Sequence, residues 1–305
     1  MSKKSHDKHK YFFVGIITGI AVLAIIIVGI IAIRNYMYNQ QQSKIIHPVL
    51  ETKKTEAKDL PEDLKKQLKI ASSTATLRVP ILLYHYVEIV QNPKDTMRIE
   101  LNIQPTVFEQ QVKTLADARY TFMTAKDLGD VLDGKTQMPE KPVLLTFDDG
   151  HWDLATSILP ILKKYHAKAT AYVIPGFIGG SDFMTSQQLQ EVINSGLVDV
   201  GAHTVHHISL KGRPLAVDQY EVDQSKTMLE QTYHIKVVSF AYPYGTFDQQ
   251  AVQVVKNDNF TTAVSTATGI EQNQANRFFL YRLRPGYRTG QILLTYLSQN
   301  YFRSY

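Results

Sequence analysis

The sequence predicts an α/β protein with a parallel sheet, either open or closed into a barrel, preceded by a single N-terminal membrane helix. From residue 79 to residue 283, short apolar runs alternate with segments of helical spacing, which is the pattern of strands joined by crossover helices. Residues 11–33 form an uncharged run rich in Ile, Val, Ala and Gly. As a helix, this run would span a hydrocarbon core of about 30 Å.

The expected strands are short apolar runs, and the helices between them show apolar residues at helical spacing. Strands are expected at residues 79–87, 143–147, 169–174, 198–202, 237–242, 261–265 and 278–283. Helices are expected at residues 105–118, 154–165, 185–194, 217–233 and 249–257. Because chemistry in such folds collects at the carboxyl ends of the strands, functional residues should follow directly after the apolar runs.

The run at 11–33 favours a retained membrane anchor over a cleaved signal peptide. The apolar part of a signal peptide is usually about 7–15 residues and ends at small residues, whereas this run leads into Arg34, Tyr36 and Tyr38, which suit a membrane interface. Lysines precede the run, so residues 1–10 are expected in the cytoplasm. We expect a stalk at 34–76 and an extracellular domain at 77–305 of a single-pass cell-membrane protein.

The formal net charge of +5 is concentrated near the N-terminus. Within residues 1–10, four lysines against Asp7 contribute +3, and Arg34 adds one, which leaves about +1 for the rest of the chain. A nearly neutral domain lacks the basic surface that nucleic-acid binding requires, so no nucleic-acid partner is expected. The chain has no cysteine, so any metal would be held by His, Asp or Glu.

Two adjacent carboxylates follow the expected strand 143–147, in the segment Thr146-Phe147-Asp148-Asp149-Gly150. Neighbouring side chains of a strand point to opposite faces, but a turn at Gly150 would let both carboxylates face one cavity. Their repulsion would raise one pKa unless a cation lies between them. The alternative is an ordinary Asp-Gly turn in which Asp149 is a helix N-cap.

Three histidines, His203, His206 and His207, follow the expected strand 198–202. His203 and His207 are four residues apart, so one helical turn would put both imidazoles on the same face. Imidazole is the commonest nitrogen ligand of zinc and similar ions. The alternative is a solvated surface cluster, and we expect His206 to be structural.

Two weaker signals also lie at strand ends. In Tyr242-Pro243-Tyr244-Gly245, a tight turn could aim a backbone N–H into the cleft, where such a donor stabilises an oxyanion. His85 lies in the segment that ends the first expected strand and would by itself be interpreted as a core residue.

Together these residues predict a catalytic metal centre. Asp149, His203 and His207 supply three ligands, and three protein ligands leave a position for water, as in catalytic zinc sites. A water on such a metal has its pKa lowered to about 7 and is a nucleophile at neutral pH. Asp148 lies where a general base should. The chain has no Gly-x-Ser-x-Gly elbow and no His-Glu-x-x-His motif, so the corresponding classes are excluded.

These motifs resemble those of the polysaccharide deacetylases of carbohydrate esterase family four, which includes chitooligosaccharide and peptidoglycan deacetylases. Thr-Phe-Asp-Asp-Gly and His-Thr-x-x-His are similar to its two metal-site motifs, and Tyr-Pro-Tyr-Gly is similar to its third. The resemblance covers the chain from about Val79 onward and implies a distorted (β/α) barrel of about seven parallel strands. The roles it implies are Asp148 as catalytic base, Asp149, His203 and His207 as metal ligands, and the Tyr244 N–H as oxyanion donor.

Two departures from the family pattern resemble its biofilm branch, the poly-N-acetylglucosamine deacetylases. The position of the usual base-orienting arginine is Ala241, and the usual late Leu-x-His motif, which supplies the general acid, is missing. In that branch a Tyr-His after the first strand looks like the replacement acid, which here is His85. Arg282 and Arg284 share one face of the last expected strand, and either could replace the missing arginine.

The sequence therefore predicts a zinc-dependent enzyme that removes acetyl groups from a cell-surface N-acetylglucosamine polysaccharide. Two alternatives stay open: the same chemistry on peptidoglycan, and a non-catalytic glycan-binding membrane protein on a decayed scaffold. The missing arginine favours the second alternative, whereas paired carboxylates beside imidazoles argue against it.

Overall fold

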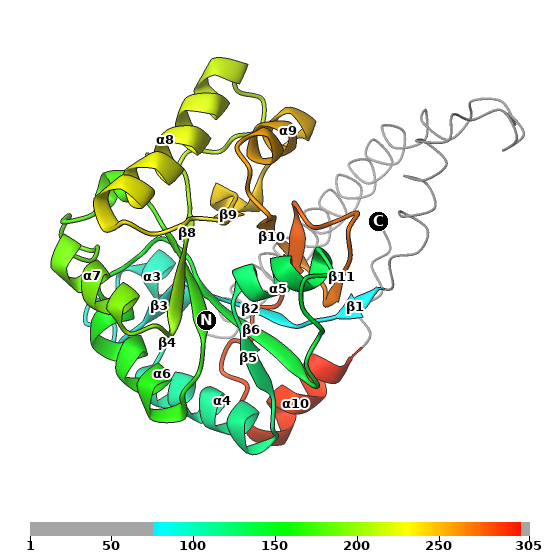
Figure 1. Cartoon of the computed structure of the whole chain (residues 1–305). Helices are drawn as coiled ribbons and strands as arrows, with labels where there is room; N and C mark the ends of the chain where they lie inside the picture. Colours follow the sequence, from blue (N-terminus) through cyan, green and yellow to red (C-terminus); the bar gives the residue numbers. More distant parts are fainter. Residues whose placement is uncertain (1–75, 300–305) are drawn as a thin grey trace, which may run out of the picture. The chain divides into compact units, whose positions relative to one another are not determined.

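The computed structural model describes residues 76–299, which form an α/β barrel (Figure 1). The predicted N-terminus at 1–10, the membrane helix at 11–33 and the stalk up to residue 75 lie outside the described residues. Within residues 76–299 no helix combines the length and the apolar character needed to cross a membrane.

Seven parallel strands make up the barrel, as predicted. In their order around it, they are β2 (Ile81–Tyr84), β6 (Pro142–Phe147), β7 (Ala169–Val173), β8 (Val198–Ala202), β9 (Ser239–Ala241), β10 (Thr262–Thr268) and β12 (Leu280–Arg282). The ring is nearly closed just after β12, where the Leu283 N–H donates to the carbonyl of Ile81 at 2.8 Å and its carbonyl accepts from Leu83 N–H at 2.9 Å.

Helices cover the outside of the strands, and all five predicted helices are present. They are α4 (Pro105–Asp117), α6 (Leu159–Tyr165), α7 (Ser186–Asn194), α8 (Leu215–Tyr233) and α9 (Gln249–Asn257). The helix expected from residue 154 begins with a π-helical turn, η2 (Leu154–Ile158). Pro160 has no N–H to donate to the preceding turn, which accounts for the altered hydrogen bonding there.

Several short elements were not predicted. They are β1 (Leu77–Arg78), β3 (Tyr86–Val87), α3 (Thr96–Leu101), β4 (Asn102–Ile103), β5 (Thr121–Met123), α5 (Ala125–Leu132), β11 (Glu271–Gln272) and α10 (Gly290–Ser298). The single strand expected at 79–87 is divided at His85, because β3 leaves the barrel to pair with β4. His85 therefore lies where the chain turns away from the barrel.

Alternate residues of the strands point into and out of the barrel. Leu144 and Leu280 belong to the small apolar cluster formed by one face of the strands, whereas Val143 and Leu145 pack into the larger cluster with the helices. Continuing the inward face by two-residue steps leads from Leu144 through Thr146 to Asp148, and from Leu280 to Arg282. The barrel thus directs a carboxylate that follows β6 and a guanidinium of β12 toward each other.

Candidate active site

The two aspartates lie where β6 ends in a tight turn. The Asp148 N–H still donates to the carbonyl of Tyr84 at 3.0 Å, and the backbone then enters the left-handed region at Asp149 (φ 75°) and Gly150 (φ 81°). A Cβ at Gly150 would lie 3.2 Å from Val173 Cγ1, so this turn favours glycine. The predicted turn is confirmed, and the N-cap alternative for Asp149 is wrong, because the next helix begins only at Leu154.

The two candidate ligand histidines meet Asp149 without forming a helical turn. His203 and His207 lie in an irregular loop after β8, and the backbone is left-handed at Thr204 (φ 59°) and His207 (φ 54°). The predicted helical turn is therefore wrong, since these two conformations break any helix. The loop still brings both Nε2 atoms to 3.3 Å from Asp149 Oδ1.

The donor atoms of these three residues fit a divalent cation. They lie within 4.8 Å of one another, and Asp149 Oδ1 is buried without a hydrogen-bond partner, as expected of an atom that awaits a cation. His203 Nδ1 is 2.7 Å from the carbonyl of Ala241, which fixes the proton on Nδ1 and leaves the lone pair on Nε2 for a metal. Two nitrogens and one carboxylate oxygen form a donor set that suits zinc.

The carboxylate of Asp149 and the imidazoles influence each other's protonation. Burial would raise the pKa of Asp149, but contacts with His151 and His203 hold it well below its ordinary value. Burial would lower the pKa of His203, but Asp149 and Asp148 raise it instead. Protons therefore compete with a cation for Nε2 of His203, so the affinity for metal is expected to fall as the pH falls.

Arg282 occupies the place of the base-orienting arginine. Its Nη1 and Nη2 each donate to one oxygen of Asp148 at 2.7 Å, its Nε donates to the carbonyl of Ser265 at 2.8 Å, and both ionic side chains are buried. Burial would raise the pKa of Asp148, but the Arg282 charge and hydrogen bonds lower it. Asp148 is thus held ionised in a fixed orientation, and Arg282 rather than Arg284 makes this contact.

His85 lies near the aspartate pair, and Tyr244 lies beside His207. Burial lowers the pKa of His85 to about 4, although the charges of Asp148 and Asp149 oppose the change. Tyr244 has a left-handed backbone (φ 59°) in the turn η4 (Pro243–Gly245), and its exposed ring lies 4.6 Å from the ring of His207. The structure therefore brings all six predicted residues into one region of the barrel.

Glu221 of α8 holds the histidine loop and was not anticipated. Its Oε2 accepts from the N–H groups of Val205 (2.8 Å) and His206 (3.0 Å), and its Oε1 is 2.7 Å from His206 Nδ1. This confirms that His206 points away from the other histidines. Because α8 begins well after the loop in the chain, no local pattern in the sequence links Glu221 to it.

Replacing Glu221 by Ala is expected to destabilise the fold by about 2–5 kcal/mol, since two backbone N–H groups lose their acceptor in a buried position. The loop would then hold His203 and His207 less firmly, and zinc affinity should fall with stability. Urea unfolding with and without zinc measures both effects. Glu221→Gln keeps an acceptor and should lose less of each; equal losses in the two variants would contradict this role.

The fold and site define the class of protein: a barrel hydrolase with a candidate metal centre beside an arginine-paired carboxylate. The sequence profile of the family described as polysaccharide deacetylase matches residues 135–263, a range that contains the aspartate pair, the histidine loop and Tyr244. Over this range the chain is similar to that family, and the protein is a hydrolase of the polysaccharide deacetylase type.

Individual proteins are similar to this chain over a longer range than residues 135–263. YxkH of Bacillus subtilis, a candidate polysaccharide deacetylase, is 28% identical over 239 residues, which cover 78% of this chain and 82% of YxkH. Poly-β-1,6-N-acetyl-D-glucosamine N-deacetylase of Staphylococcus aureus is 23% identical, with 73% of this chain and 82% of that protein covered. The crystal structure of the Streptococcus pyogenes deacetylase PplD with acetate superposes with a TM-score of 0.68 at 29% identity, covering 74% of this chain and all of PplD (100%).

Proposed function

We propose that this protein is a zinc-dependent N-deacetylase of a poly-N-acetylglucosamine polysaccharide, anchored in the cell membrane by residues 11–33 with its barrel outside the cell. The observation that carries the proposal is the convergence of Asp149, His203 and His207 beside the Asp148–Arg282 pair. The Staphylococcus aureus relative, named for its action on poly-β-1,6-N-acetyl-D-glucosamine, supports the choice of substrate.

Zinc held by Asp149, His203 and His207 would polarise the acetyl carbonyl and make a bound water acidic. Asp148 is the general base, because it is ionised and its two oxygens are aligned by Arg282. The Tyr244 N–H donates to the acetyl oxygen as negative charge develops there. The attack of water and departure of the amine then cleave the C–N bond and release acetate and a free amino sugar.

His85 supplies the proton that the departing amine needs. With a pKa of about 4, its ring is neutral at pH 7, so the proton it donates has to reach it during turnover. The charge of Asp148 raises the pKa of His85, so the two side chains are close enough to interact. A proton removed from water by Asp148 is the nearest source.

The Asp148–Arg282 pair counts against a non-catalytic scaffold. The missing arginine at Ala241 was the main reason to consider a decayed site, and Arg282 makes the bidentate contact that this arginine would supply. A buried ion pair of this kind is costly to retain, and a glycan-binding surface would have no use for it.

Acetate release from defined N-acetylglucosamine oligomers tests the proposal. We expect release from β-1,6-linked oligomers that stops with a chelator and returns with zinc, because the three ligands alone cannot activate water. Peptidoglycan in the same assay is the competing substrate. Faster release from peptidoglycan would overturn the choice of polysaccharide, and no release from either substrate with zinc present would overturn the catalytic role.

The anchor is tested separately by cell fractionation. The full chain is expected in the membrane fraction, with its barrel open to protease added outside intact cells, and a chain that begins at residue 35 should leave that fraction. Barrel protection from external protease would contradict the proposed orientation.

A further inference from the structure

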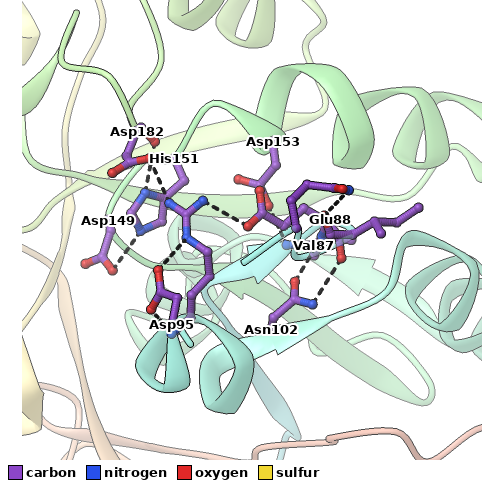
Figure 2. A network of polar contacts seen from close by, with 11 residues as sticks. Val87, Glu88, Asp95, Asn102, Asp149, His151, Asp153 and Asp182 are labelled. Atoms are coloured by element: carbon purple, nitrogen blue, oxygen red, sulfur yellow. Dashed lines mark hydrogen bonds and ion pairs between the residues drawn. The ribbon is translucent and has the colours of Figure 1, made fainter. Parts of the chain in front are cut away.

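The two carboxylate oxygens of Asp149 face in different directions. Oδ1 lies 3.3 Å from Nε2 of both His203 and His207, whereas Oδ2 lies 3.3 Å from Nε2 of His151. Figure 2 shows the contact between Asp149 and His151. A carboxylate held at its outer oxygen cannot rotate freely, so its inner oxygen stays directed at the ligand group. Partners of this kind orient the ligands of many metal sites.

His151 is itself held on both faces of its ring. Its Nδ1 is 3.1 Å from the backbone carbonyl of Asp182, as Figure 2 shows. The ring lies between those of Tyr86 and Phe183, with centroids at 4.0 Å and 4.9 Å and interplanar angles of 26° and 25°. Only 5% of the side chain is exposed, so the imidazole has one available orientation.

Arg98 of α3 secures the surroundings of His151. Its Nη2 donates to Asp182 Oδ1 at 2.8 Å, and its Nη1 donates to Glu88 Oε1 at 3.0 Å. Its guanidinium also lies 4.6 Å from the centre of the Tyr86 ring. One arginine therefore fixes both Asp182, whose backbone carbonyl lies beside Nδ1 of His151, and one of the rings stacked on His151.

We propose that His151 is a positioning residue for metal binding: its Nε2 holds Asp149 Oδ2 so that Oδ1 meets the cation together with His203 and His207. The inference rests on the proposed metal-dependent function and adds a fourth histidine to it, one that touches no cation. A ring that served only as core packing between Tyr86 and Phe183 would need no nitrogen facing Asp149.

Two substitutions distinguish the role of the Nε2 donor of His151 from the packing role of its ring. His151→Phe keeps an aromatic ring between Tyr86 and Phe183 but removes the donor, and is expected to weaken zinc binding by about 10–100-fold. His151→Gln places an amide donor near the position of Nε2 and should retain most of the affinity. His166→Phe is the matched control, because His166 is exposed at the end of α6 and lies outside the histidine loop, and its zinc affinity should be unchanged.

The experiment titrates the metal-free proteins with zinc against a competing chelator, with thermal unfolding of each metal-free variant as the control for folding. Acetate release by His151→Phe should recover at saturating zinc, since its chemistry is intact. Equal affinity in His151→Phe and the unmodified protein would overturn the inference, and so would equal losses in the Phe and Gln variants. His151→Leu, which also lacks a donor, replaces the Phe variant if that one does not fold. Failure of the unmodified protein to bind zinc would instead overturn the proposed function, and the inference with it.

Discussion

Replacing Asp148 by Asn is expected to reduce acetate release by about 10²–10⁴-fold, the typical contribution of one proton-transfer group. An amide cannot accept the proton of the attacking water, while Asp149, His203 and His207 still offer their three donor atoms. Turnover should therefore be lost and zinc affinity kept. Turnover numbers at saturating substrate, together with zinc titrations, measure both quantities.

The control for this variant has to allow for the buried charge that it leaves on Arg282. Removing one partner of a buried ion pair costs about 3–5 kcal/mol, so the unfolding of the Asn variant must be measured beside its activity. Asp199→Asn changes a carboxylate of β8 that lies toward the other end of the strand and should leave turnover unchanged. Near-normal turnover in a folded Asp148→Asn protein would remove Asp148 from its role as base.

Arg282→Met is expected to show the second large effect, a loss of about 3–5 kcal/mol in stability at neutral pH, because Asp148 is left buried without its cation. Activity should fall as well, since burial would then act unopposed and raise the pKa of Asp148. A protonated carboxyl group cannot serve as a base, so the acidic limb of the pH–rate profile should move to higher pH.

The sign of the pH dependence of stability distinguishes the two proteins. In the unmodified protein the folded-state pKa of Asp148 is lowered, so its contribution to stability is present above the unfolded pKa and is lost as the pH falls through the folded pKa. In Arg282→Met the folded pKa lies above the unfolded one, and acidification relieves the cost of burying the charge. The difference in the free energy of unfolding between the unmodified protein and Arg282→Met should therefore shrink as the pH is lowered. A difference that does not change with pH would show that lost packing, rather than the unpaired charge of Asp148, causes the loss of stability.

Two further variants test whether the loss of stability in Arg282→Met arises from the bidentate contact with Asp148. Arg282→Lys keeps the charge but not the paired hydrogen bonds, so it should lie between the Met variant and the unmodified protein. Arg284→Met changes the neighbouring arginine, which is exposed, and should cost little stability. A larger loss from Arg284→Met than from Arg282→Met would show that the wrong arginine had been selected.

The order of strands and helices could be predicted because parallel barrel strands are buried on both faces and leave continuous apolar runs. All five residues of β7, for example, are buried. The short elements α3, β3 and β4 could not be predicted, because they are held by tertiary contacts such as the Arg98–Glu88 ion pair rather than by their own apolar pattern.

The ligands of the candidate site could be predicted from strand ends, but their geometry could not. The spacing of His203 and His207 suggested a helical turn, whereas left-handed residues at Thr204 and His207 bring the rings together. Arg282 was one of two arginines allowed by the two-residue period of a strand, and only barrel closure selects between them. The orientation of His151 could not be predicted, since its contacts with Asp182 and Phe183 depend on a loop 31 residues away.

The central claim is that three side chains, which follow the ends of β6 and β8, hold a single cation beside Asp148. Diffraction data collected at the zinc absorption edge, from crystals grown with zinc, test it most directly. The account predicts one anomalous peak at about 2.0–2.2 Å from Asp149 Oδ1 and from Nε2 of His203 and His207. A peak bound elsewhere on the barrel, with these three atoms left without zinc at saturating concentration, would contradict it.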